Sequence, residues 1–199
     1  MKDEDLSPVI CHPSLNNYHR LIERVDRHCQ GIQKQFGELM DCRKGCCACC
    51  RHISVFPVEA AAMMDYIAKL PKKILACPDQ YDEIRLTECP LLSEGECLIY
   101  PARPLICRTH GFPLLTVESD MPVISCCPQN FQKISPIPSQ AVIDLEPLNR
   151  MLVAINALFL KEWTQNSWPT ARIQLVDVIR SAYSNSIHET GKLPHDGDH

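Results

Sequence analysis

Residues 42–52 read CRKGCCACCRH, and this run decides how the rest of the chain is organised. Five cysteines occupy the nine positions from Cys42 to Cys50. A free cysteine in an apolar core needs no cysteine neighbours, whereas a thiolate cage needs about four sulfur ligands within roughly 2.3 Å of each metal ion. Gly45 tolerates the tight turns of a chain that folds back on a metal. The run therefore predicts a metal site.

The composition predicts that these thiols are reduced. The chain has 199 residues, 13 cysteines and a net charge of -4, and its acidic start, residues 1–5, is followed by no apolar run. We therefore expect no secretory signal, and no stretch approaches the roughly 18 apolar residues of a membrane helix. In the cytoplasm, cysteines at this density serve as metal ligands or redox groups. Without a basic excess, neither nucleic acid nor membrane is expected as a partner.

The hydrophobic pattern predicts a mainly α fold, with helices at both ends packed around an irregular Cys- and Pro-rich centre. One domain is expected over residues 14–185. Residues 14–40 carry an apolar stripe at steps of three and four, with Ser14 as the N-cap. A second helix is expected from Pro57 to Leu70. Residues 147–185 predict two closing helices, with these inner faces: Leu148, Met151, Leu152, Ile155, Leu158 and Phe159, then Leu175, Val178, Ile179 and Ala182.

The middle of the chain predicts little regular structure. Residues 71–147 hold 11 of the 16 prolines, and proline removes a backbone donor and fixes φ. We expect at most a few short strands, at Ile53–Val55 and Val123–Ser125. Residues 1–13 are expected to be a loose lead-in, and residues 188–199 a disordered tail.

Two further segments supply cysteines. Residues 89–108 read CPLLSEGECLIYPARPLICR, and the Ser-Glu-Gly-Glu turn at 93–96 can bring Cys89 and Cys97 together as a small knuckle. A third segment begins with Cys126 and Cys127 and continues Pro-Gln-Asn-Phe. Spacing alone makes these weaker metal signatures than residues 42–52.

Together these motifs resemble the YkgJ-type cysteine-cluster family, which is described as carrying a zinc- or iron-chelating domain. The resemblance rests on C-x3-C-x2-C-C at residues 42–50 and on the stretch at residues 89–108. It covers roughly residues 40–131, which is the expected metal-binding region of 42–131. Cys47 falls at a free position of the family pattern, and of the Cys126–Cys127 pair the second cysteine matches it. The resemblance implies eight thiolate ligands: Cys42, Cys46, Cys49, Cys50, Cys89, Cys97, Cys107 and Cys127.

Eight thiolates suit one or two centres, either zinc or a 4Fe-4S iron–sulfur cluster. The sequence does not divide the ligands between centres. Adjacent side chains such as Cys49 and Cys50 point in different directions and can serve different centres. The C-x3-C-x2-C spacing also holds a cubane cluster in radical S-adenosylmethionine enzymes, which places iron–sulfur slightly ahead of zinc. The strand–helix alternation of their barrel is missing here, so that enzyme class is disfavoured.

The remaining candidates have simpler interpretations. Cys29 lies on the apolar stripe and is expected to be a buried thiol, while Cys11 and Cys77 match no motif. His52 and His110 are expected to lie beside the metal or on the surface. Five cations are expected to offset the negative charge of thiolate centres: Arg43, Lys44, Arg51, Arg103 and Arg108.

The predicted function is metal binding, with a redox or accessory role and a protein partner that the sequence does not identify. One alternative is a structural zinc protein that mediates interactions. Another is a protein-modifying enzyme, because flagellin lysine N-methylases resemble this family in their cysteine cluster. A thiol–disulfide oxidoreductase is disfavoured, because its βαβ context is missing. Whether the chain is an enzyme stays open.

Overall fold

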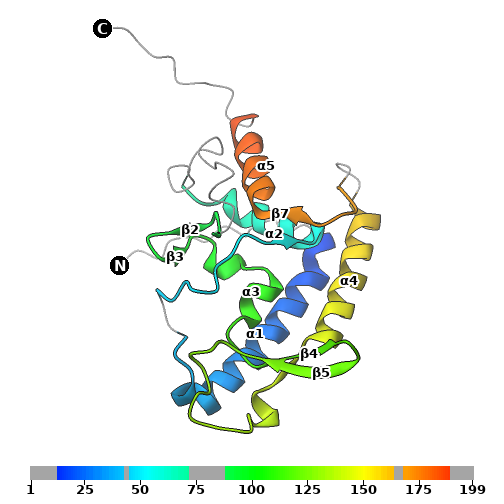
Figure 1. Ribbon diagram of the computed structural model, residues 1–199. Coiled ribbons are helices and arrows are strands. Elements are labelled where there is room, and N and C mark those ends of the chain that lie inside the picture. The colour runs from blue at the N-terminus through cyan, green and yellow to red at the C-terminus, as the bar shows by residue number, and fades with distance from the viewer. Residues whose placement is uncertain (1–12, 43–44, 72–87, 164–167, 189–199) are drawn as a thin grey trace, which may run out of the picture.

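The computed structural model describes residues 13–42, 45–71, 88–163 and 168–188, with side chains only up to residue 182 in the last segment. The fold is mainly α with a few short strands, as the sequence predicts (Figure 1). The predicted lead-in up to residue 12, Cys11, Cys77 and the tail after residue 188 lie outside the described residues. Among the helices that the structure describes, none has the length and apolar character needed to span a bilayer.

The helices form where the apolar periodicity predicts them. Their bounds are α1 Asn16–Phe36, α2 Pro57–Ile67, α3 Leu105–Thr109, α4 Leu145–Glu162 and α5 Leu175–His188. Proline opens α2 at its first position, where a missing N–H costs nothing. The short helix α3 lies in the proline-rich middle and carries Cys107.

Helix α1 buries the predicted stripe. Its inner face includes Tyr18, Val25 and Cys29, each less than 8% exposed. The predicted N-cap is wrong, because a 3-10 turn, Pro13–Leu15, precedes the helix and Leu15 takes the cap position without a side-chain hydrogen bond. Ser14 lies buried within that turn.

The strands are short, and most lie between α2 and α4. They are β1 Ser54–Val55, β2 Leu92–Ser93, β3 Glu96–Cys97, β4 Leu114–Glu118, β5 Met121–Ser125, β6 Ile143–Asp144 and β7 Ile173–Gln174. Three sheets result: β1 pairs antiparallel with β7, β2 antiparallel with β3, and β4 lies between antiparallel β5 and parallel β6. Both predicted strands are confirmed, but the pattern did not reveal β4, the partner of β5.

Helix α4 begins two residues before its predicted start, and five of the six residues of its predicted inner face are buried or pack against the core. Asp144 caps it, since its carboxylate accepts a hydrogen bond from the Glu146 amide (3.0 Å). The buried face contains Leu152, Asn156 and Phe159. Leu158 was expected on this face, but it is 47% exposed because it lies on the opposite side of the helix.

Two hydrophobic clusters make up the core, and α2 contributes to both. The first cluster joins α1, α2 and α4 to the β4–β6 sheet, and the second joins α2 and α5 to the β2–β3 hairpin. Figure 1 shows α1 and α4 side by side, with α5 beyond α2 at the other end of the molecule. The Asn156 side chain fastens α4 to α2, because it accepts a hydrogen bond from the Val58 amide (3.1 Å).

A buried carboxylate ties α2 to α3. Glu59 is 2% exposed, and its two oxygens accept hydrogen bonds from the amides of Phe56 (2.9 Å) and Leu105 (3.0 Å). Phe56 precedes α2 and Leu105 opens α3, so one side chain satisfies an unpaired donor at the start of each helix. This contact ties the start of α3, the helix that carries Cys107, to the first turn of α2.

Glu59 should also make stability depend on pH. Burial raises the pKa of its carboxyl, more than the two amides and the Arg172 charge lower it. The folded state therefore holds this proton more tightly, and the associated stability is present below the unfolded pKa and lost as pH rises through the folded pKa. We expect wild type to gain unfolding free energy relative to Glu59→Gln as pH falls from 7 towards 4. Urea unfolding of both proteins measures this difference; a constant gap would contradict it.

Candidate metal centre

The cysteine run of residues 42–50 lies on irregular chain between α1 and β1. A turn closes its end, where the Cys50 amide donates to the Cys47 carbonyl (2.9 Å). Arg51 then forms an isolated antiparallel bridge with Glu88. This bridge brings the end of the run beside Cys89, from the second cysteine segment.

Four of the predicted ligands gather on irregular segments, and we call them the loop set: Cys42, Cys46, Cys49 and Cys127. Burial raises the pKa of Cys42, and the charges of the other three members raise it further. Burial likewise raises the pKa of Cys49, to which Cys46 and Cys127 add. Because Coulomb interactions weaken with distance and screening, such mutual effects indicate that these thiols are neighbours.

Asn130 holds the loop set together, although the sequence analysis gave it no role. It is 5% exposed, and its Nδ2 donates to the Gly111 carbonyl (2.6 Å) and to Cys42 Sγ (3.2 Å). Its Oδ1 accepts from the Asp41 amide (2.7 Å). Nearby, the Phe131 amide donates to the Leu39 carbonyl (2.7 Å). The cysteine run is thus fastened to the segment that carries Cys127.

Removing this amide should loosen the loop set. In Asn130→Ala, the Asp41 amide loses its acceptor, Cys42 Sγ loses a donor and the buried Gly111 carbonyl loses the shorter of its two hydrogen bonds, at a cost of about 1–3 kcal/mol. We expect weaker metal binding by the loop set with little change in far-UV circular dichroism. Gln132→Ala is the matched control, because that exposed amide donates only to the nearby Pro128 carbonyl (2.7 Å). Equal metal content in the two variants would contradict this role.

The other four predicted ligands form the hairpin set: Cys50, Cys89, Cys97 and Cys107. Burial raises the pKa of Cys107 to about 12, and the other three members contribute to the rise. Burial raises the pKa of Cys50 to about 11, with contributions from Cys49 first and then Cys89 and Cys97. The same reasoning therefore makes these thiols neighbours.

The predicted knuckle is present in the hairpin set. Strands β2 and β3 pair across Glu94 (φ 50°) and Gly95 (φ 79°), which places Leu92 opposite Cys97. The Leu91 amide donates to Cys89, and the Ile99 amide donates to Cys97. Each sulfur thus accepts a hydrogen bond from the amide two residues further on. Such bonds stabilise a thiolate.

The two sets meet at Cys49 and Cys50, which are consecutive in the chain. The Cys50 thiol donates a hydrogen bond to Cys49, so the sets are adjacent. Among the residues that the structure describes, no three His, Cys, Asp or Glu side chains converge tightly enough to hold a metal ion. The thiols therefore lie in two neighbouring groups, and the described side chains do not converge on a common metal position.

The remaining cysteines and histidines have other surroundings. Cys126 lies beside the loop set, and its thiol donates to the Gly111 carbonyl (3.4 Å), while Cys47 lies near Cys50. Burial lowers the pKa of His52, and its Nε2 accepts a hydrogen bond from the Val176 amide (3.4 Å) at the start of α5. His110 is exposed.

Two of the five predicted cations have defined structural positions. Arg103 lies over the Tyr100 ring (3.6 Å), donates to the Cys107 carbonyl (3.3 Å) and lowers the pKa of Cys97 and Cys107. Arg108 is 8% exposed and pairs with Asp26 (2.6 Å). Arg51 is exposed, and residues 43 and 44 lie outside the described residues.

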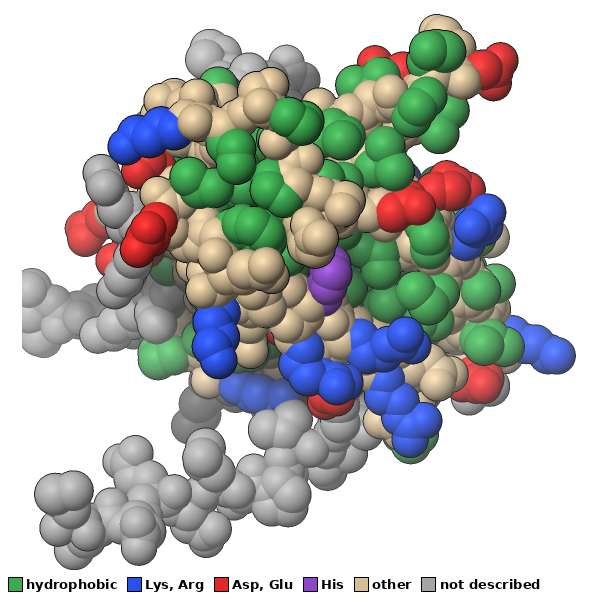
Figure 2. Space-filling model, turned by 90° about the horizontal axis from the view of Figure 1, so that it is seen from below, with side chains coloured by type: hydrophobic (Ala, Val, Ile, Leu, Met, Phe, Trp, Pro, Cys, Tyr) green, Lys and Arg blue, Asp and Glu red, His purple; other side chains and the backbone are tan. Residues whose placement is uncertain are grey.

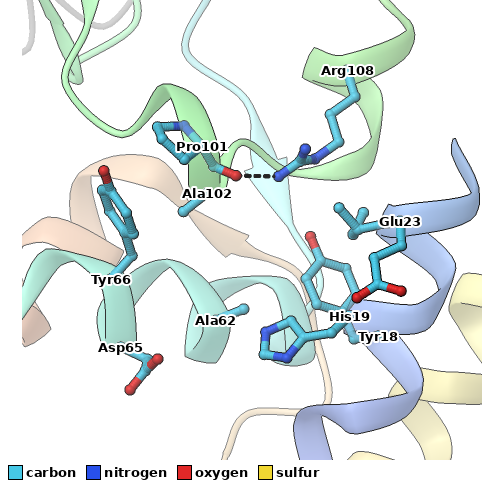
Figure 3. A pocket seen from close by; sticks show the side chains of 10 residues that line it. Tyr18, His19, Glu23, Ala62, Asp65, Tyr66, Pro101, Ala102 and Arg108 are labelled. Atoms are coloured by element: carbon cyan, nitrogen blue, oxygen red, sulfur yellow. Dashed lines mark hydrogen bonds between the residues drawn. The ribbon is translucent and has the colours of Figure 1, made fainter. Parts of the chain in front are cut away.

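Arg108 also borders a pocket of about 270 Å³ between α1, α2 and α3. Figure 3 shows its guanidinium donating to the Pro101 carbonyl (2.5 Å), above the ring of Tyr18. The described residues that line this pocket include none of the eight predicted ligands. The pocket is therefore separate from both cysteine sets.

Comparison with known proteins supplies no relative. No protein-family model, curated protein or solved structure matches this chain. The resemblance to the YkgJ type therefore stays a prediction from the motifs, and the site is interpreted from its own residues.

Proposed function

We propose that this protein binds metal through two adjacent four-thiolate centres, one formed by the loop set and one by the hairpin set. The observation that carries the proposal is the division of the eight predicted ligands into two groups of four. Four thiolates complete the coordination of one zinc ion or one cubane cluster. The two sets draw on three separated segments, so a bound metal would link segments that share little regular structure.

The donor chemistry favours a soft metal. All eight donors are sulfur, which suits zinc and iron–sulfur clusters and suits magnesium or calcium poorly. The loop set contains all three cysteines of C-x3-C-x2-C, and Cys127 supplies the fourth. For this reason we place a 4Fe-4S cluster slightly ahead of zinc. The corresponding function is a redox or accessory role in a reducing compartment, where thiols stay available as ligands.

A structural zinc protein is the second candidate, and the hairpin set favours it. Two of its sulfurs flank a tight β-turn and accept amide hydrogen bonds, and two others come from separate segments. Four thiolates would fill the coordination sphere of a zinc ion and leave no position for a substrate, as in structural zinc sites. Bound zinc would then contribute directly to the free energy of folding.

Thiol–disulfide exchange has less support. The motif offers Cys46–Cys49 and Cys47–Cys50 as C-x-x-C pairs. Burial raises the pKa of Cys49 and of Cys50, whereas a reactive thiol needs a lowered pKa. A bound metal would lower the pKa of these thiols, because its positive charge stabilises the thiolates that bind it.

Metal analysis of protein purified without oxygen tests the proposal. We expect about two zinc ions, or about eight iron and eight inorganic sulfide, for each chain. Cys42→Ser and Cys107→Ser should each remove half of the metal, because each lies in a different set. Absorbance near 400 nm would accompany iron and be missing for zinc.

Cys29→Ala is the control for general loss of thiols. Cys29 is buried and its sulfur donates to the Arg108 carbonyl (3.8 Å), so this variant should keep the full metal content. Metal-free wild type would refute the proposal. Loss of all metal from both ligand variants would instead indicate a single shared centre.

A further inference from the structure

We infer that the two centres have different tasks: the hairpin set holds a permanent structural metal, whereas the loop set holds a metal that exchanges with solution. The inference rests on the proposed function, since it assigns roles to the same two sites. It comes from the backbone and burial around each set, which differ in three respects.

The first difference is the backbone that carries the ligands. All four cysteines of the loop set lie outside helices and strands. In the hairpin set, Cys97 lies in β3 and Cys107 in α3, whereas Cys89 precedes the β2–β3 hairpin and Cys50 lies on the same irregular run as the loop set. A ligand on irregular chain can move away from a metal through a local opening, whereas a ligand on a paired strand requires a larger unit to open.

The second difference is what surrounds the sulfurs. Cys89 and Cys97 pack against the second hydrophobic cluster, with Leu91 and Ile99 beside them at 2% and 1% exposure. In the loop set, Cys49 is exposed. Solvent and competing ligands therefore approach the loop set at Cys49.

The third difference is how each cysteine set is joined to the hydrophobic core. The second cluster unites α2, α5 and the hairpin, and Glu59 fixes the start of α3 to α2. The hairpin set thus sits where these elements converge. The loop set connects instead to the first cluster, against which Phe131 and Cys126 pack, and Asn130 joins the start of the cysteine run to that segment.

The surface near the loop set is also open. Strand β5 ends directly before Cys126 and Cys127, and the β4–β5 hairpin exposes Val117 (66%), Met121 (65%) and Ile124 (47%). Figure 2 views the molecule from below, the side on which β4 and β5 lie in Figure 1, and shows hydrophobic side chains uncovered next to a group of Lys and Arg side chains. No described element covers this hairpin face.

Chelator kinetics on the full chain test the inference. The protein is loaded with zinc as the probe metal under anaerobic conditions and mixed with a large excess of a chromogenic chelator. We expect one equivalent to leave quickly and the second at least about tenfold more slowly, as a difference of about 1.4 kcal/mol in opening free energy implies. Circular dichroism should stay constant during the fast phase and change during the slow phase.

Two matched variants show which cysteine set releases zinc in the fast phase and which in the slow phase. Cys49→Ser should remove the fast phase and keep the slow one with an unchanged thermal melt. Cys97→Ser should remove the slow phase and lower the melting temperature. If the Cys97→Ser protein does not fold, the Cys49→Ser result still decides, because it must retain one slowly released equivalent.

The outcomes of this experiment distinguish a failure of the proposed metal binding from a failure of the different roles inferred for the two centres. Protein that takes up no zinc would refute the proposed function. Release of two equivalents in one phase, or loss of the slow phase in Cys49→Ser, would refute the division of tasks while leaving two metal centres in place.

Discussion

Replacing Gly111 with alanine is expected to expel the metal from the loop set and to lower the free energy of unfolding by about 2 kcal/mol. Gly111 has φ +92°, a conformation that L side chains rarely adopt. An added Cβ would also lie 2.7 Å from Cys42 Sγ, closer than two such atoms can approach. The sulfur must move, and with it the hydrogen bond from Asn130. Metal analysis and urea unfolding measure the two effects.

Gly31→Ala is the matched control for this substitution. Gly31 lies within α1, and an added Cβ there meets no atom within 4 Å. Alanine is the better helix former, so this variant should gain about 0.5–1 kcal/mol and keep its metal. If Gly111→Ala retained both metal equivalents, the close contact between Gly111 and Cys42 would have no part in the site.

Replacing Glu59 with alanine is expected to lower the free energy of unfolding by about 3 kcal/mol. One buried and one part-buried amide lose their acceptor, and each unpaired group costs about 1–3 kcal/mol. The amides are those of Phe56 and Leu105. The start of α3 should loosen from α2, and Cys107 with it, so metal in the hairpin set should become easier to remove. Thermal melts and chelator release measure these effects.

Glu146→Ala is the matched control for Glu59→Ala, because it removes an acidic side chain that is exposed instead of buried. Glu146 is also an acidic residue in the first turn of a helix, but its side chain is 60% exposed and pairs with Arg150 at 3.5 Å. Surface pairs of this kind contribute about 0–1 kcal/mol. Similar losses in the two variants would mean that Glu59 does not connect α2 to α3 in the way its hydrogen bonds indicate.

Helices were the part of the fold that the sequence could predict. Apolar residues recurring every three to four positions identify α1 and α5, because a helix needs one continuous buried face and little else. In α4 the same rule misassigned Leu158. This helix carries apolar side chains on its exposed side as well as on its buried side, and a polar residue, Asn156, lies on the buried side. A pattern of hydrophobicity does not reveal that this amide accepts a bond from α2.

The cysteines were predictable as a group, and the knuckle at residues 93–96 was predictable from its turn. The division of the ligands was not. It depends on the bridge between Arg51 and Glu88, which brings the end of the cysteine run beside the segment of Cys89, and such pairing between distant segments leaves no local signal. Asn130 and Glu59 were missed for the same reason, because each acts through hydrogen bonds to backbone far away in the chain.

The pairing of β1 with β7 has a consequence for synthesis. Ser54 pairs with Gln174, and the Leu175 amide donates to the Ile53 carbonyl, so the segment just after the cysteine run completes its contacts with an element that is translated much later. Both thiol sets, in contrast, are complete once residue 127 has been made. On the ribosome all eight cysteines of the two sets are therefore translated before α5, which completes the second cluster.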